Sequence, residues 1–599
     1  MKIGIRPGNN GGVLDHRVYR AAFLPALVAV FVLAFSLSDV PRAQTTRLAP
    51  LAFDSARATA TVGDLAERFP RRRPGSTDDS RLADVVAERF EATGFAPADG
   101  VERRGFTADT IDGDAALETV AATREGLSRR ALLVIAHRDA PGVGAAAELS
   151  GTAVLLELAR LFADRDLAKT VVLASVSGGS GGFAGAREAA RAVEGPVDGV
   201  IVLGDLASDN RRRPLVVPWG TGSDPAPLGL SRTVAAAVRA EAGVNPGEPG
   251  ALAQMIRRAV PLALSEQGAV SREGLPAVLI SASSERRPDP AAEVLPAQVE
   301  AFGRATLRAL YAALEAESFD RGDGVVAFKR LVPTWAIRLL VLALLAPALL
   351  TAFDGFFRAR RRGAPIGAWA LWALAFGLPV AAAWLWARLL HFTNAVSALG
   401  APTAGGDLRL GTAGWVGMAS TLLVAAAVGY AVARRSPRGP QLAAGAPAAA
   451  AGLMLSALVL AVWLLNPYAA AVLLPATHAW LLAPAPDRTL WRGMGVAAIA
   501  VGLLGPLIVV AYYVNAWQLG PVEGLWTTFN LVAGGVLGIG AAVTAAGFFA
   551  ALCATIAILR ARRTLADSAP AADERLMTRG PRSYAGPGSL GGTESALRR

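Results

Sequence analysis

The pattern of hydrophobic and polar positions divides the chain into two parts of different character. From about residue 45 to 325, short apolar runs alternate with segments in which apolar residues recur at helical spacing. From about Pro333 onward, long apolar segments follow one another with few charged residues between them. Strands that alternate with helices are typical of an α/β domain, and apolar segments of about 20 residues can cross a bilayer. The sequence therefore predicts an α/β domain followed by an all-α transmembrane helix bundle.

In the first part, five short runs rich in β-branched and other apolar residues are predicted strands. They are 118–122, 132–136, 170–175, 200–203 and 277–281. Apolar residues at helical spacing predict helices at about 58–69, 80–93 and 296–315, and a further helix from Gly151. This alternation predicts a three-layer α/β/α domain with a parallel or mixed sheet.

In the second part, seven apolar segments are predicted membrane spans. They lie at about 333–353, 366–390, 412–433, 442–465, 468–485, 494–515 and 528–559. A further apolar segment, 21–37, follows a basic N-terminal stretch, as in a signal peptide or a signal anchor. We expect an uncleaved anchor, because no clear small-x-small cleavage site follows it.

Clusters of arginine predict the orientation of these spans. The clusters lie at 358–362, 434–438, 488–492 and 560–563. Counting the anchor, eight spans place every cluster on the cytoplasmic side, as the positive-inside rule requires. We therefore expect a multi-pass protein of the cell membrane with both termini in the cytoplasm. The predicted parts are a cytoplasmic N-terminus and anchor (1–44), an extracytoplasmic domain (45–325), the bundle (326–563) and a disordered cytoplasmic tail (564–599).

Composition supports a membrane protein over a nucleic-acid-binding one. The 599 residues are 53% hydrophobic and only 18% charged. The net charge of +11 comes largely from arginines beside apolar spans, so it indicates topology and a lipid bilayer as partner, not nucleic acid. The single cysteine, Cys553, excludes an intrachain disulfide.

One histidine stands at the end of the predicted central strand. The strand at 132–136 is followed by His137-Arg138-Asp139, and a loop rich in glycine, alanine and proline then leads to the helix from Gly151. Binding sites of α/β proteins lie at the carboxyl ends of such strands. His137 and its loop are therefore the first candidate site.

This stretch resembles the zinc aminopeptidase family, peptidase family M28, whose members carry His-x-Asp after such a strand. The turn at 70–76 (PRRRPGS) between two predicted helices also fits the family. By this resemblance, His137 matches the first zinc ligand and Asp139 its orienting partner. Asp205, in the sequence VLGDL, matches an acidic ligand that follows a later strand. The resemblance implies an aminopeptidase fold with a site for two zinc ions.

Several ligands of that family pattern are absent. The bridging aspartate is replaced by Ala147, and Glu148 follows where the family has asparagine. The loop at 175–186 keeps the family's glycines, including those around Ser180, but lacks the glutamate pair that supplies the general base. The family's second histidine is replaced in the sequence RRPD, which ends at Asp289. Of the four histidines, only His137 belongs to 45–325.

The sequence therefore favours a catalytically degenerate protein, although the question of enzyme activity stays open. The leading hypothesis is a membrane-anchored, non-catalytic M28-like protein without a cofactor, which binds a peptide or an envelope partner or scaffolds a membrane complex. Glu148, Ser180 and Asp289 are then residues of its cleft. A first alternative is a divergent zinc metallopeptidase that uses His137, Asp139 and Asp205 with Glu148 or Asp289. A second is a transporter or lipid-handling protein whose outer domain is accessory.

Overall fold

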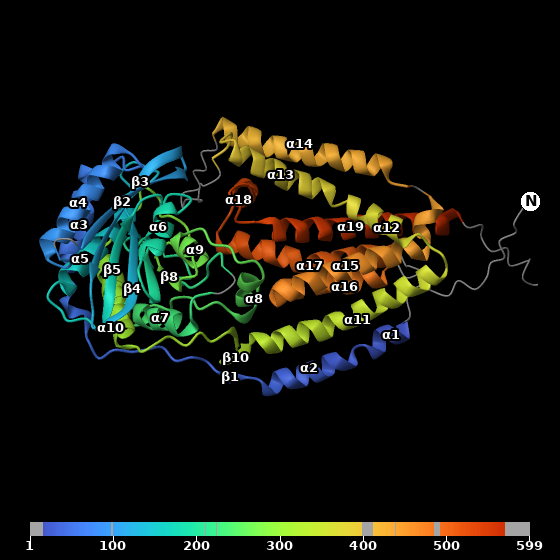
Figure 1. The fold of residues 1–599 in the computed structure, drawn as a ribbon, viewed down its shortest axis with the longest axis horizontal. Helices are drawn as coiled ribbons and strands as arrows, with labels where there is room; N and C mark the ends of the chain where they lie inside the picture. The colour runs from blue at the N-terminus through green and yellow to red at the C-terminus, as the bar shows by residue number, and fades with distance from the viewer. Residues whose placement is uncertain are drawn as a thin grey trace, which may run out of the picture.

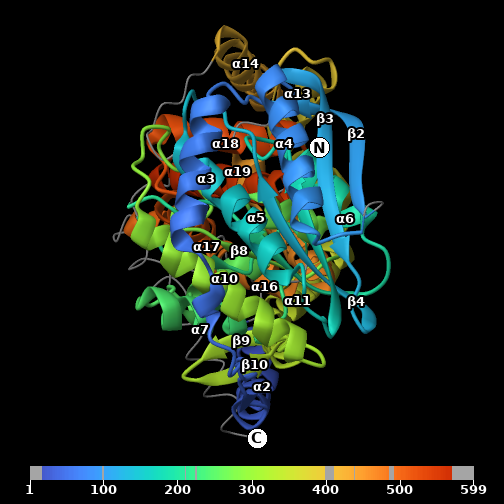
Figure 2. The same cartoon turned by 90° about the vertical axis from the view of Figure 1, so that its left-hand side faces the viewer.

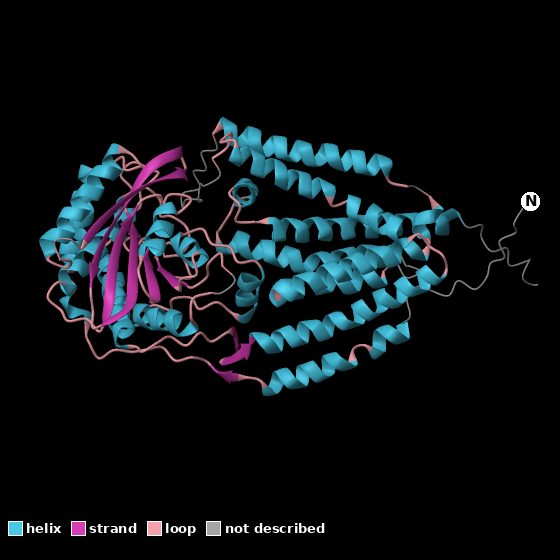
Figure 3. Cartoon of the chain, in the orientation of Figure 1, coloured by secondary structure: helices cyan, strands magenta, loops and turns pink. Residues whose placement is uncertain are grey.

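A computed structural model describes residues 16–97, 100–209, 211–222, 225–397, 411–437, 439–483 and 492–568. An α/β domain lies at one end of a bundle of long helices, which run along the long axis of the molecule (Figure 1). Figure 3 shows that the strands are concentrated in the α/β domain and that the bundle is helical throughout its described part. The predicted combination of an α/β domain with a helix bundle is confirmed.

The α/β domain is built on a seven-stranded mixed sheet with the order β2-β3-β5-β4-β6-β8-β7. The strands are β2 (Val101–Thr110), β3 (Gly113–Arg124), β4 (Ser128–His137), β5 (Lys169–Val176), β6 (Val197–Leu203), β7 (Val216–Val217) and β8 (Ala277–Ile280). The four central strands β5, β4, β6 and β8 are parallel, and antiparallel strands flank them on both sides. The carboxyl ends of the parallel strands therefore meet at one edge, where α/β proteins place binding sites.

Helices cover both faces of the sheet, because successive residues of a strand point to opposite sides. In β4, Leu132 and Val134 face one core, whereas Leu133 and Ile135 face the other. The first core is covered by α3 (Ser55–Arg68), α4 (Thr77–Thr93), α5 (Ser150–Phe162), α7 (Leu228–Ala242) and α10 (Pro296–Glu315). The second is covered by α6 (Ala184–Ala192) and α9 (Glu266–Arg272).

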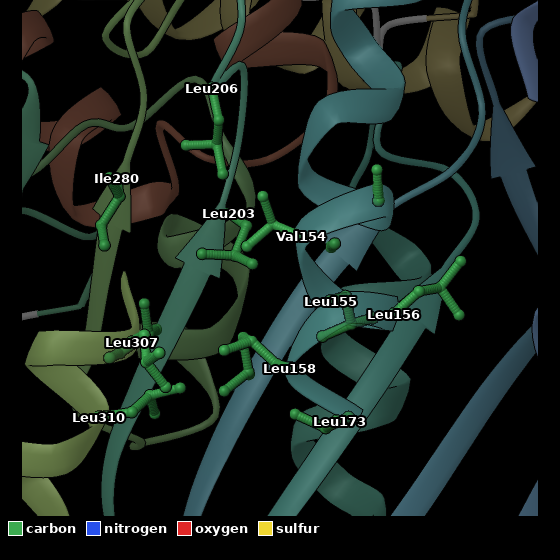
Figure 4. Close-up of a cluster of buried hydrophobic side chains, with 14 of the residues drawn as sticks. Val154, Leu155, Leu156, Leu158, Leu173, Leu203, Leu206, Ile280, Leu307 and Leu310 are labelled. Atoms are coloured by element: carbon green, nitrogen blue, oxygen red, sulfur yellow. The ribbon is translucent and has the colours of Figure 1, made fainter. Parts of the chain in front are cut away.

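The figures show how these layers are placed. The view onto the domain shows α3, α4 and α5 in front of the sheet (Figure 2). Figure 4 shows leucines of α5 and α10 packed against the face of the sheet in the first core. The predicted three-layer arrangement is thus observed, with α6 and α9 on the face that is turned toward the bundle (Figure 1).

The remaining long helices form the bundle. They are α11 (Thr334–Arg361), α12 (Ile366–Ala375), α13 (Leu378–Phe392), α14 (Thr412–Arg435), α15 (Gly445–Leu465), α16 (Pro467–Leu482), α17 (Arg492–Ala516), α18 (Pro521–Ala533) and α19 (Ile539–Ser568). The N-terminal helices α1 (His16–Ala21) and α2 (Leu24–Phe35) pack beside α11 (Figure 1). Among the described residues, six helices are long and apolar enough to cross a membrane.

Three of the predicted spans look different in the structure. The segment at 366–390 is the helix pair α12 and α13, bent by 43° and counted as a seventh span if it is continuous. The segment at 468–485 contains α16, which has only 16 residues. The last span does not begin at 528, because a glycine-rich break separates α18 from α19 and the long helix starts at Ile539. That helix continues to Ser568, past the expected start of the tail, and 1–15 and 569–599 lie outside the described residues.

A small sheet lies at the junction of the two parts. It has the order β1-β10-β9, with β1 (Ser38–Asp39), β9 (Gly324–Ala327) and β10 (Arg330–Pro333) all antiparallel. Strand β1 follows α2, and β10 leads directly into α11. The α/β domain is thus connected to the bundle at two helix ends that lie side by side.

Candidate functional site

Four loops meet at the carboxyl edge of the parallel strands. His137 is the last residue of β4, and Asp205 stands two residues after β6. The glycine-rich loop after β5 and the loop at 281–288 after β8 come from the neighbouring strands. A short 3-10 helix, Ala146–Leu149, precedes α5 and contributes Glu148. The sheet topology therefore brings together residues that are far apart in the sequence.

His137 lies between two carboxylates. Its Nε2 atom is 2.9 Å from Oε2 of Glu148, and its Nδ1 atom is 3.4 Å from Oε2 of Glu266. Burial alone would lower the pKa of the imidazole, but the charge of Glu266 and the hydrogen bonds with both glutamates raise it to about 10. His137 is therefore an imidazolium at neutral pH, with both ring nitrogens donating.

Arg287 completes this cluster of charges. Its Nη1 atom is 3.2 Å from Oε1 of Glu148, so that Glu148 lies between two cations. Burial would raise the pKa of Glu148, but Arg287 and His137 hold it below its usual value. All three side chains are at most a tenth exposed. We call His137, Glu148, Glu266 and Arg287 the buried ion cluster.

Asp139 and Ser180 connect the loop after β4 with the loop after β5. The carboxylate of Asp139 accepts hydrogen bonds from the backbone N–H groups of Gly179 and Ser180, each at 2.8 Å. A Cβ atom on Gly179 would lie 2.5 Å from Cβ of His137, so only glycine allows this close approach. Asp139 thus holds the loop after β5 against His137.

Asp205 and Asp289 have different surroundings. Asp205 is buried and accepts hydrogen bonds from the N–H groups of Ala207 and Ser208 and from the hydroxyls of Ser208 and Ser283. Burial raises the pKa of Asp205 in spite of these bonds. Asp289 is exposed and accepts a hydrogen bond from the N–H group of Ala291 at 2.9 Å. Asp205 therefore joins its own loop to the loop at 281–288, whereas Asp289 orders only its own turn.

The cavity at the site is small. His137, Glu148 and Asp205 all line it, and its volume is about 30 Å³. A water molecule needs about 10–15 Å³ by the same measure, so the cavity has room for about two waters. It is too small for a peptide side chain.

The resemblance implies zinc, and we tested whether these residues fit it. Among the described residues, no group of three His, Cys, Asp or Glu side chains is placed to hold a metal ion. Zinc requires a neutral imidazole and ionised ligands that no other cation occupies. Here His137 donates to two carboxylates, Arg287 occupies the second oxygen of Glu148, and Ala147 is buried without a ligand atom. This arrangement does not fit a zinc ion.

Two residues of the buried ion cluster were not among the predicted site residues. Arg287 lies in the RRPD sequence, at the place where the family has its second histidine, so a signal for it was present. Glu266 lies at the start of α9, after a loop and not after a strand. No motif in the sequence marks Glu266.

With this geometry described, comparison with known proteins places the fold. Residues 119–249 match the sequence model described as Peptidase family M28. The α/β domain is similar to peptidase family M28. No curated protein matches the sequence.

Solved structures match the M28-like domain over nearly their whole length. Glutaminyl cyclase from Fimbriiglobus ruber is 19% identical, with 45% of this chain and 98% of that chain covered and a TM-score of 0.34. Aminopeptidase from Aneurinibacillus sp. strain AM-1 is 13% identical, with 45% and 97% covered and a TM-score of 0.35. A leucine aminopeptidase precursor from Bacteroides thetaiotaomicron is 17% identical, with 43% and 97% covered and a TM-score of 0.34.

The loop at 281–288 also contacts the bundle. Glu285 forms a buried ion pair with Arg257 of α8 (Ala251–Ala259) and accepts a hydrogen bond from Nε1 of Trp517 at 3.1 Å. Arg257 donates to the Tyr512 hydroxyl at 3.0 Å. The next residue, Arg286, donates to the carbonyl oxygen of Trp517 at 2.9 Å. One loop therefore contacts the candidate site through Arg287 and the end of α17 through Glu285 and Arg286.

Proposed function

We propose that this chain is a non-catalytic membrane scaffold, in which an M28-like domain is fixed on a helix bundle and presents its outer surface to an envelope partner. The observation that carries the proposal is the position of Arg287. Its guanidinium pairs with Glu148, which in turn pairs with a charged His137. A hydrolytic site would need these groups free to hold metal and water.

The contact between the M28-like domain and the bundle supports a scaffold. The Arg257–Glu285 pair belongs to the M28-like domain, has side chains only 1% exposed, and packs against three aromatic rings of α17 and the residues that follow it. Buried pairs of this kind are costly to break, because each partner would leave an unpaired charge. A domain that had to open for substrate would gain little from such a contact.

The small cavity limits how a partner is bound. Since it has room for about two waters, a peptide or chain terminus does not enter at His137. The partner, a peptide segment or a membrane protein, therefore contacts the outer surface of the domain. The second partner is the lipid bilayer around the apolar helices.

The N-terminal helices support the proposal of a signal anchor. The hydroxyl of Tyr19 is 2.9 Å from Nδ1 of His478 in α16, and Phe23 stacks on the same imidazole. Ala26 and Ala29 of α2 pack with Ala343 of α11. Cleavage after α2 would expose these contacts, so we infer that the helix is retained. Eight spans, counting α16 and the bent pair, then place both termini in the cytoplasm.

The test is metal content together with hydrolysis, on the full-length protein in detergent. After incubation with zinc and dialysis, elemental mass spectrometry should find far less than one zinc per chain. Aminoacyl and N-terminal glutaminyl peptides should remain intact with and without a chelator. The variants His137→Ala and Asp205→Ala are compared with Glu273→Gln, a control on the exposed Arg191–Glu273 pair.

The opposite result would favour the divergent zinc peptidase. It would consist of at least one tightly held zinc ion that is lost in His137→Ala and Asp205→Ala, with hydrolysis that a chelator abolishes. The scaffold proposal would then be wrong, because metal would have displaced Arg287 from Glu148.

A further inference from the structure

A second, much larger cavity lies on the side of the M28-like domain that faces the junction. Its volume is about 720 Å³, in the range of small-molecule sites. It lies between α7, α8 and the hairpin of β9 and β10, and α8 and β10 adjoin the bundle in Figure 1. None of the predicted site residues lines it.

The wall of this cavity is strongly basic. Arg232, Arg258, Arg321 and Lys329 line it, and Glu248 is the one carboxylate among its described lining residues. The Nε atoms of Arg232 and Arg258 are buried without a hydrogen-bond partner in the described part of the chain. These Nε atoms are closed off from the cavity, so it is the excess of positive charge on the wall that favours an anionic ligand.

Only Arg258 has a carboxylate partner in the described structure, Asp323 at 3.1 Å. For Arg232, Arg321 and Lys329, no ion pair is found within the described residues. Within the part of the chain that the structure describes, these three cations lie around one cavity without an ion-pair partner, and an anion would relieve their mutual repulsion. The charge of the cavity therefore favours a ligand with at least one negative group.

The rest of the wall is apolar. Trp219, Leu228 and Val326 line the cavity, and Phe328 stands at its rim, fully exposed at the tip of the β9–β10 hairpin. A fully exposed phenylalanine next to a lysine is typical of a segment that lies in a membrane interface. The cavity therefore suits an amphiphile better than a free anion.

The cavity lies at the level where the apolar helices begin. The hairpin of β9 and β10 continues into α11 at Thr334. Arg258 lies 5.4 Å from the ring centroid of Tyr468, at the start of α16. Val40, which also lines the cavity, follows the strand after α2. The ends of α2, α11 and α16 thus surround this side of the domain.

We propose that this cavity binds the phosphate headgroup of an anionic membrane lipid. Arg232 and Arg321 hold the phosphate oxygens, Trp219 and Leu228 cover the glycerol backbone, and the acyl chains pass Phe328 toward α2 and α11. Guanidinium groups bind phosphate through paired hydrogen bonds, and basic pockets beside membrane helices bind anionic lipid headgroups. This proposal does not depend on the scaffold function or on the state of His137.

The test is native mass spectrometry of the full-length protein in nonionic detergent, titrated with phosphatidylglycerol or phosphatidylcholine of the same acyl chains. Phosphatidylglycerol should bind at least about 10-fold more tightly than phosphatidylcholine, since several cations face its net charge. The double variant Arg232→Gln, Arg321→Gln should weaken phosphatidylglycerol about 30-fold, because each cation near a lipid surface contributes a factor of about five. Arg321→Gln alone, on an exposed side chain, should weaken it about fivefold.

The matched control is Arg330→Gln. Arg330 follows Lys329 on the same hairpin but pairs with Asp39 and does not line the cavity. This variant should bind phosphatidylglycerol as the wild type does. If the double variant unfolds, the single variant Arg321→Gln decides.

Three results would overturn the proposal. The first is equal affinity of the wild type for the two lipids. The second is the same loss of binding in Arg330→Gln as in Arg321→Gln. The third is complete displacement of phosphatidylglycerol by an excess of inorganic phosphate, which would mean a site for the free anion and not for a lipid.

Discussion

Removing the charge of Glu285 tests the buried ion pair that the M28-like domain packs against the end of α17. In Glu285→Gln, the guanidinium of Arg257 stays buried but loses its counter-charge. Breaking one partner of a buried pair costs about 3–5 kcal/mol. Arg257 keeps the Tyr512 hydroxyl and the carbonyl oxygen of Leu262 as acceptors. We therefore expect the lower end of that range, about 3 kcal/mol.

The assay is the apparent unfolding midpoint of the full-length protein in detergent, followed by tryptophan fluorescence. For domains of this size, about 1 kcal/mol lowers the midpoint by about 2 °C, so Glu285→Gln should lower it by about 6 °C. The control is Glu273→Gln, because the partner of Glu273, Arg191, is 58% exposed. Exposed pairs contribute at most about 1 kcal/mol, or about 2 °C. Equal midpoints for the two variants would mean that the buried Arg257–Glu285 pair contributes no more to stability than an exposed pair.

Three further predictions concern the site and the anchor. The raised pKa of His137 means that the folded protein binds the proton of the imidazolium more tightly than the unfolded chain does. The stabilisation that this proton provides is therefore complete below about pH 6.5 and declines as pH rises toward 10. Unfolding midpoints measured against pH should show this decline in the wild type and not in His137→Gln. Gly179→Ala should cost about 1–3 kcal/mol through its clash with His137, whereas Gly63→Ala, with nothing near its Cβ position, should cost nothing in the same unfolding assay. Tyr19→Phe should lower the unfolding free energy by about 1 kcal/mol by removing the hydrogen bond to His478, and intact mass spectrometry should show α2 retained; an unchanged stability would count against the packed anchor.

The sequence predicted those elements well whose own pattern of apolar residues matches their burial in the fold. The strand predicted at 132–136 lies inside β4, and the helix predicted at 296–315 has the bounds of α10. In both segments, the larger apolar residues stand at the positions that are buried in the structure. Strand β2 was missed, because it is an edge strand with half of its positions exposed and three charged residues in its first half. Its place is set by pairing with β3, which no local pattern reveals.

The helix ends in the bundle were less predictable. Hydropathy alone joined 528–559 into one span, since valine, leucine and alanine are abundant on both sides of the break. Gly535 has a φ of +78°, a conformation that ends α18 and lets the chain turn before α19. Glycines are common in membrane helices, so their presence did not mark this break in advance.

The candidate site was predicted only as far as its loops follow strands. His137, Glu148 and Asp205 line one cavity because the parallel strands end at the same edge. Glu266 could not be predicted, because α9 reaches His137 through the packing of the second core and no strand precedes it. Asp289 follows the expected loop but points to solvent, since the turn after Pro288 lies outside the core.

The loop at 281–288 links the candidate site to the bundle, and this link is itself testable. Glu285 contacts the bundle and Arg287 contacts Glu148, only two residues apart on one short loop. If the bundle fixes the backbone of this loop, Arg287→Met should cost less in the Glu285→Gln background than in the wild type. Contacting residues of one network show coupling of about 0.5–3 kcal/mol, whereas separate sites are additive within about 0.5 kcal/mol.

The measurement is a double-mutant cycle on unfolding free energies in detergent. The control cycle pairs Arg287→Met with Glu273→Gln, whose partner Arg191 is far more exposed, and it should be additive. Additivity in the Glu285 cycle as well would mean that the two ends of the loop are independent. The buried ion cluster would then be a property of the M28-like domain alone. Coupling would mean that the contact with the bundle keeps Arg287 on Glu148 and so keeps the candidate site closed.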